Sequence, residues 1–126
     1  MSGSLHNRRI LVVEDENLLM HELAMRLEDA GAVVLGPCAS ADCALGCLDS
    51  KQKVDIAVLD LNLNGEPVDA VADALQARGI PFVITSGYDT DDTEDRYRGV
   101  PHFGKPVDFA ALFEALAAFP DARRAG

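Results

Sequence analysis

Several short apolar segments of this 126-residue chain end in side chains that could take part in chemistry. Acids follow two of these segments, a hydroxyl pair ends a third, and a lysine follows a fourth. The residues are Glu14 and Asp15, Asp60, Thr85 and Ser86, and Lys105. Each type alone is common at the end of a strand, where acids cap helices and hydroxyls form turns. Because each type stands at a different segment end, we expect them to form one site.

The chemistry of such a site follows from its charges. Crowded carboxylates repel one another, which favours a bound proton or a bound cation. Carboxylate oxygens with open water positions suit Mg²⁺ or Mn²⁺. The metal and an ammonium would neutralise the oxygens of a phosphoryl group, and a hydroxyl would donate a hydrogen bond to one of them. We expect Asp60 to be the nucleophile, with an aspartyl phosphate as its product.

The segments that must position these residues alternate between strands and helices. Apolar runs predict strands at residues 10–13, 32–35, 54–59 and 80–84, and a weak fifth at 101–103. Apolar residues at helical spacing predict helices at residues 18–30, 41–48, 68–77 and 109–119. We expect Asn17 and Ser40 to cap the first two helices. The stretch 89–95 holds five acids, so it is predicted to be a loop or a short turn.

This order predicts an α/β fold. We expect a five-stranded, doubly wound parallel sheet covered by helices on both faces, with a short or irregular fourth helix. In such a sheet, ligands bind at the carboxyl ends of the strands, near the switch in strand order. The residues at the strand ends are therefore expected to gather at one edge.

The charge of the chain excludes some classes of partner. The chain has 21 acidic and 11 basic residues, a net charge of −10, and its few basic residues do not cluster. Such a chain repels nucleic acid and anionic membrane surfaces, so we expect neither as a partner of this domain. No apolar run approaches the roughly 20 residues of a membrane span.

The three cysteines are Cys38, Cys43 and Cys47. Their odd number, their tight spacing and the lack of a signal peptide predict reduced thiols in a cytoplasmic protein, with no disulfide. Cys43 and Cys47 are four residues apart and lie on one face if the segment is helical. We expect small buried apolar residues here rather than a metal site.

Four motifs, in this order, resemble the receiver domain of two-component response regulators. They are Ile10–Glu16, Val58–Asp60, Thr85–Gly87 and Lys105–Pro106. The resemblance covers about residues 8–119 and implies the flavodoxin-like (βα)5 fold of single-domain, chemotaxis-type regulators. We therefore expect a receiver domain at 8–119 between a flexible tail at 1–7 and a second tail at 120–126.

The resemblance also implies roles for the acids and the lysine. Asp60 matches the phosphoacceptor. Mg²⁺ (or Mn²⁺) would be held by Asp15, Asp60 and the backbone carbonyl of Asn62, with Glu14 bound through water. Lys105 matches the lysine that pairs with the phosphoryl group.

The remaining site residues flank the strand ends. Ser86, followed by the small residue Gly87, fits the family's hydroxyl position, and Thr85 is the alternative register. His102 stands where the family has its switch aromatic, so the switch is expected to differ here or to sense pH.

Asn62 and Tyr88 lie two residues beyond Asp60 and Ser86. The resemblance implies that these two positions influence how fast the acyl phosphate hydrolyses.

The implied function is phosphoryl acceptance from a phosphohistidine of a histidine kinase or a histidine phosphotransfer protein. A conformational switch would then signal to an unknown protein target. Such a domain is a phosphoacceptor rather than an enzyme, apart from slow self-dephosphorylation. The alternative is a receiver-like protein-binding module that is not phosphorylated. An aspartate-based phosphatase would need a second Asp where Asn62 stands.

Overall fold

The computed structural model describes residues 5–61, 63, 68–87, 97 and 99–120. Within them, one parallel sheet has the strand order β2-β1-β3-β4-β5. The strands are β1 (Arg9–Val13), β2 (Val33–Cys38), β3 (Ile56–Asp60), β4 (Phe82–Ser86) and β5 (His102–Gly104). The helices are α1 (Asn17–Asp29), α2 (Ala41–Asp49), α3 (Asp69–Ala77) and α4 (Phe109–Ala118). The predicted doubly wound α/β fold is confirmed.

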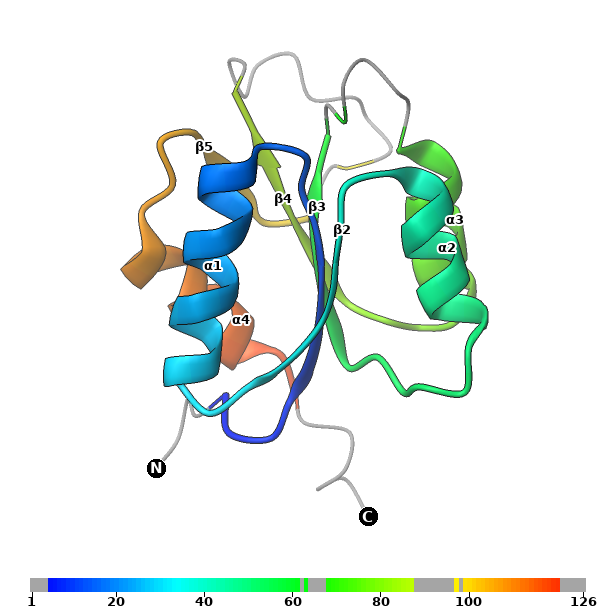
Figure 1. The fold of residues 1–126 in the computed structure, drawn as a ribbon, viewed down its shortest axis with the longest axis horizontal. Helices are drawn as coiled ribbons and strands as arrows, with labels where there is room; N and C mark the ends of the chain where they lie inside the picture. Colours follow the sequence, from blue (N-terminus) through cyan, green and yellow to red (C-terminus); the bar gives the residue numbers. More distant parts are fainter. Residues whose placement is uncertain (1–4, 62, 64–67, 88–96, 98, 121–126) are drawn as a thin grey trace.

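Both faces of the sheet are buried. Helices α2 and α3 cover one face, and α1 and α4 cover the other (Figure 1). Along β1, Leu11 and Val13 pack towards α2 and α3, whereas Ile10 and Val12 pack towards α1 and α4. Because alternate side chains enter two different apolar layers, the strand is a continuous apolar run rather than an alternating one.

The strand order changes direction between β1 and β3. From β1 the chain first moves outward to β2, and it then returns to place β3 on the other side of β1. The carboxyl ends of β1 and β3 are therefore neighbours at this switch point, which is where doubly wound sheets bind ligands.

Some boundaries differ from the predictions. Strand β2 continues past Gly36 to Cys38, since Cys38 pairs with Val13 after a shift in register. Pro37 is tolerated because β2 is an edge strand. Helix α1 begins at Asn17 with Glu16 at the N-cap position, so Asn17 is not the cap.

Ser40 caps α2 as predicted, since its Oγ accepts a hydrogen bond from the backbone N–H of Cys43 at 3.1 Å. The acidic stretch 89–95 lies outside the described residues.

The two ends of the described chain are packed together. Leu5 is only 4% exposed and belongs to the apolar layer under α1 and α4. Arg8 donates hydrogen bonds from Nη1 to the carbonyls of Leu116 at 3.2 Å and Phe119 at 2.7 Å. None of the described helices has the length and hydropathy needed to cross a bilayer.

The cysteine prediction was wrong. Cys38 and Cys43 form a disulfide, and Cys47 is a free thiol. The fold places the end of β2 beside the first turn of α2, with the two Cα atoms 5.4 Å apart, which is an ordinary spacing for a disulfide. The sequence argument used the number and spacing of the cysteines and the expected lack of a signal peptide, and none of these predicts this proximity.

Candidate functional site

The strand ends gather acidic and hydroxyl side chains at one edge of the sheet. Glu14 and Asp15 directly follow β1, and Asp60 is the last residue of β3. Carboxylate oxygens of these three residues lie within 4.8 Å of one another. Two adjacent acids after β1 and a third, distant in sequence, therefore form one acidic cluster, as predicted.

Lys105 directly follows β5 and reaches into this cluster. Its Nζ donates to Glu14 Oε2 at 3.0 Å and to Asp60 Oδ2 at 3.2 Å. The contact with Glu14 was not foreseen, because the sequence predicted only that Lys105 would pair with a phosphoryl group. The available signal in the sequence was that a lysine, Lys105, follows the predicted fifth strand.

The cluster is removed from water. The side chains of Glu14 and Asp60 are each 1% exposed, and that of Lys105 is 20% exposed. Burial of charge is costly unless the charge is paired, so the two contacts of Lys105 offset part of this cost. Asp15 is only half-buried and is the acid of the cluster with the most access to solvent.

The pKa values of Glu14 and Lys105 reflect burial and the charges of the neighbouring groups. Burial raises the pKa of Glu14 from 4.5 to about 7; the hydrogen bond from Lys105 opposes this rise, and the charge of Asp60 adds to it. Burial alone would lower the pKa of Lys105, but Glu14 and Asp60 outweigh it and raise that pKa above its ordinary value. One ammonium does not neutralise three carboxylates.

This donor set fits a divalent cation. Glu14, Asp15 and Asp60 offer hard carboxylate oxygens close together, and the partly open side at Asp15 leaves room for water ligands. Hard oxygen donors with retained water are the preference of Mg²⁺ and Mn²⁺. The predicted backbone ligand, Asn62, lies outside the described residues.

The two hydroxyl residues end β4 beside the cluster. Thr85 is the direct register partner of Asp60, and its carbonyl accepts from the backbone N–H of Leu61 at 3.0 Å. The carbonyl of Ser86 accepts from the backbone N–H of Lys105 at 2.9 Å. Both side chains are buried. The fold thus ties Ser86 to Lys105 and Thr85 to Asp60, and Ser86 stays the predicted hydroxyl with Thr85 as the alternative.

Comparison with known proteins identifies this arrangement. SdrG from Sphingomonas melonis Fr1 is 37% identical to this chain, and the match covers 94% of this chain and 98% of SdrG at a TM-score of 0.78. A CheY-like response regulator receiver domain protein from Methanospirillum hungatei JF-1 superposes with a TM-score of 0.77 at 23% identity, over 87% of this chain and 90% of its own. The chain is a response regulator receiver domain.

Other comparisons bear on the length of the protein. No family model matches the receiver. The transcriptional regulatory protein PdtaR of Mycobacterium tuberculosis is 26% identical over 113 residues, which is 86% of this chain and 55% of PdtaR. The receiver therefore spans about half the length of the curated relatives that it matches.

The structure describes His102, the predicted switch residue. This residue lies on β5, pairs in register with Ile84 of β4, and is half-buried. Burial lowers the pKa of its imidazole below the ordinary value of 6.5, so the neutral ring is favoured near pH 7. Tyr88, predicted to influence hydrolysis together with Asn62, lies outside the described residues.

Proposed function

We propose that this receiver accepts a phosphoryl group on Asp60 from a phosphohistidine of a histidine kinase or a histidine phosphotransfer protein. The supporting observation is the setting of Asp60. Its carboxylate is buried at the switch point, lies within 4.8 Å of two other acids and accepts a hydrogen bond from Lys105 at 3.2 Å. A nucleophilic carboxylate beside a cation and a metal-binding cluster is suited to phosphoryl transfer.

In the proposed reaction, a carboxylate oxygen of Asp60 attacks phosphorus and the phosphorus–nitrogen bond of the phosphohistidine breaks. The electron pair of that bond leaves with the imidazole. Lys105, already beside Asp60, pairs with the transferred oxygens, and Ser86 donates a hydrogen bond to one of them. A divalent cation bound by Asp15, Asp60 and the Asn62 carbonyl, with Glu14 through water, would supply further positive charge.

Relatives support a phosphoryl site with a metal. SdrG has been solved in a BeF3-activated conformation, at 37% identity and a TM-score of 0.74. The response regulator TrrA of Thermotoga maritima, at 20% identity and a TM-score of 0.74, has been solved in complex with Mg²⁺-BeF. We infer that Mg²⁺, or Mn²⁺, is the cofactor here because this chain offers three carboxylates close together after β1 and at the end of β3.

The proposed output is a conformational switch. The backbone bond between Ser86 and Lys105 joins the ends of β4 and β5, so a pull on both side chains acts on both strands. A protein target would read the change, with His102 on β5 in place of the family's switch aromatic. We infer a phosphoacceptor without further catalysis, apart from slow self-dephosphorylation tuned by Asn62 and Tyr88, in a domain spanning residues 8–119.

The decisive experiment measures phosphoryl uptake. The purified chain is incubated with Mg²⁺ and acetyl phosphate, and separately with a phosphorylated histidine phosphotransfer protein, and its intact mass is measured. We expect one added phosphoryl group that is absent in Asp60→Asn and absent without a divalent cation. Asp55→Asn is the matched control, because Asp55 precedes the opposite end of β3, where its carboxylate accepts from the Arg9 backbone N–H at 2.9 Å.

An adduct on Asp60→Asn equal to that on the wild type would contradict the proposal. No adduct from either donor, under conditions that label another receiver, would favour a binding module that is not phosphorylated.

A further inference from the structure

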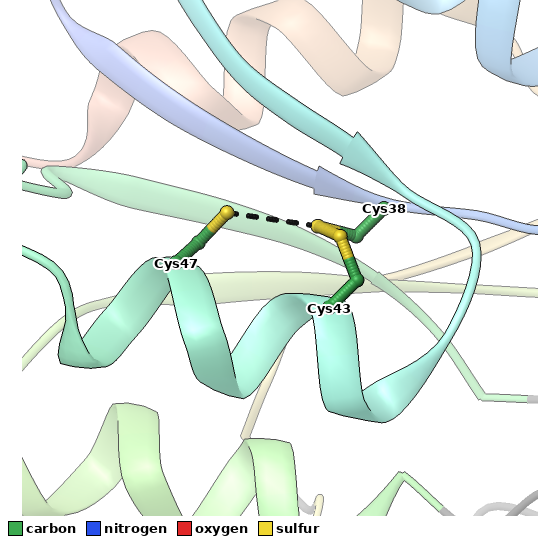
Figure 2. A group of neighbouring side chains, drawn as sticks. All are labelled: Cys38, Cys43 and Cys47. Carbon is green, nitrogen blue, oxygen red and sulfur yellow. Dashed lines mark hydrogen bonds between the residues drawn. A yellow bond between two sulfur atoms is a disulfide. The ribbon is translucent and has the colours of Figure 1, made fainter.

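A second reactive group lies between β2 and α2. Cys38 and Cys43 form a disulfide, and the Sγ of Cys47 lies 3.7 Å from the Sγ of Cys38. Figure 2 shows the thiol of Cys47 directed towards the Cys38 end of the disulfide. Three sulfur atoms therefore meet at one place, and Cys38 is next to both of the others.

The backbone holds Cys38 at the centre of this group. Cys38 is 0% exposed at the end of β2, and its carbonyl accepts from the backbone N–H of Glu14 at 2.9 Å. Gly36 makes the close turn before it: a Cβ on Gly36 would lie 2.8 Å from the Cys38 nitrogen and 3.4 Å from its sulfur. Cys38 is thus fixed by sheet pairing.

The other two cysteines are presented by α2. Cys43 and Cys47 are four residues apart, so they lie one turn apart on the same side of the helix. Cys43 is exposed, and Cys47 is half-buried. One helix therefore offers Cys38 two partners, and Cys43 is the more exposed residue of the two.

We propose that these cysteines form a thiol–disulfide exchange site in which Cys38 passes between Cys43 and Cys47. The Cys47 thiol gives its proton to solvent, and its sulfur bonds to the sulfur of Cys38. The Cys38–Cys43 bond breaks, and its electron pair leaves on Cys43, which takes up a proton. The number of disulfides is unchanged, and no net oxidation occurs.

The co-reactant that loads and unloads the site is a low-molecular-weight thiol–disulfide pair, such as reduced and oxidised glutathione. Loading converts two cysteine thiols into one disulfide and one oxidised glutathione into two thiols. In unloading, a reduced thiol first attacks the sulfur of Cys43, which is the exposed residue of the disulfide pair. A second thiol then attacks the mixed disulfide, which releases oxidised glutathione and restores two cysteine thiols.

The exchange is tested on the wild-type chain by trapping free thiols. The protein is loaded with oxidised glutathione, desalted, held at low concentration and treated with iodoacetamide without reductant. Intact mass and peptide fragmentation then give the number and the position of the labels. We expect one label per molecule, on Cys47 in some molecules and on Cys43 in others, with the Cys43 fraction rising with time and with pH.

A label confined to Cys47 at all times would mean a static disulfide and would overturn the proposal. Three labels after loading would show that no disulfide forms. Retention of one equivalent of Zn²⁺ by all three cysteines, with no disulfide after loading, would instead indicate a metal site. None of these readouts depends on phosphoryl transfer to Asp60.

Three variants separate the partners. In Cys43→Ser we expect loading to join Cys38 to Cys47, which leaves no free thiol. In Cys47→Ser we expect Cys38 to stay joined to Cys43, again with no free thiol. In Cys38→Ala we expect two labels, because helix neighbours Cys43 and Cys47 have lost their shared partner. Two labels on loaded Cys43→Ser would overturn the proposal, and circular dichroism checks that each variant is folded.

Discussion

At the residue scale, the acidic cluster is governed by the balance between three carboxylates and one ammonium. Lys105 pairs with Glu14 and Asp60, yet the pKa of Glu14 still rises to about 7 because its carboxyl group is buried. Without a metal, the cluster is therefore a local cost to folding at neutral pH. Sites that bind cations commonly carry such excess negative charge until the cation arrives.

The pKa of Glu14 gives a prediction with a defined sign. Because the folded-state pKa exceeds the unfolded value of 4.5, this group's contribution to stability is complete below pH 4.5 and is lost as pH rises through about 7. Glu14→Gln removes that loss. In EDTA we expect the free energy of unfolding of Glu14→Gln, relative to the wild type, to improve by about 1–3 kcal/mol between about pH 5 and about pH 8.

Urea unfolding at both pH values checks this, with Glu28→Gln on the exposed face of α1 as the control. If the difference in free energy of unfolding between Glu14→Gln and the wild type did not change with pH, burial would not be raising the pKa of Glu14.

At the element scale, the carboxyl end of α4 is held by a side chain from the opposite end of the sequence. Arg8 precedes β1 and donates to the carbonyls of Leu116 and Phe119. The last carbonyls of a helix have no partner within the helix, so a buried guanidinium is a suitable donor. This contact orients α4 against the sheet that carries Lys105.

We expect Arg8→Met to lower the free energy of unfolding by about 1–3 kcal/mol, because the carbonyls of Leu116 and Phe119 lose the guanidinium as a donor. In Arg8→Met, the rate at which backbone amides exchange with deuterium should increase more in α4 than in α1. Arg9→Met is the matched control, since Arg9 is the exposed neighbour of the buried Arg8. Equal exchange in α4 for the two variants would argue that Arg8 does not hold this helix.

The turn within β2 depends on a glycine. Gly36 has φ of +85°, and an added Cβ would lie 2.8 Å from the nitrogen of Cys38. Gly46 lies within α2, and a Cβ added there meets no atom within 4 Å. An added Cβ would therefore collide with the backbone at Gly36 and would enter open space at Gly46.

We expect Gly36→Ala to destabilise the domain by about 1–2 kcal/mol or more, because alanine rarely adopts this φ and the backbone must shift. Gly46→Ala should stabilise it by roughly 0.5–1 kcal/mol, since alanine favours the helix. Thermal melts of both variants test these two expectations, and a change in Tm of the same sign in both variants would contradict them.

At the scale of the whole molecule, the strand order creates the site. Because β1 lies beside β3 in the strand order β2-β1-β3, their carboxyl ends are neighbours, and Asp15 and Asp60 meet. A cation bound there joins two separate strands of the folded chain and none of the unfolded chain. Its binding free energy should therefore add to the stability of the whole domain.

We expect Mg²⁺ to raise the Tm of the wild type, with a gain of about 2–3 kcal/mol when its concentration is about a hundred times Kd. EDTA should reverse the rise, and Asp15→Asn should lose most of it. Asp42→Asn, an exposed acid in the first turn of α2, is the control. Equal responses of the two variants to Mg²⁺ would place the cation elsewhere.

The sequence by itself determined the layout of the fold and the kind of site. Strands buried on both faces must be apolar, as Ile10 to Val13 are, so charged residues such as Glu14 and Asp60 can stand only where a strand ends. Parallel strands bring their carboxyl ends to one edge. These two rules were enough to predict the acidic cluster.

Only the tertiary structure decided the contacts between distant residues. The bond from Lys105 to Glu14 spans 91 positions, and the disulfide depends on how β2 meets α2. Likewise, sheet pairing of Cys38 with Val13 overrides the turn signal of Gly36 and Pro37. Local patterns fix which face a side chain occupies, but distances of a few ångströms between elements are set by packing of the whole domain.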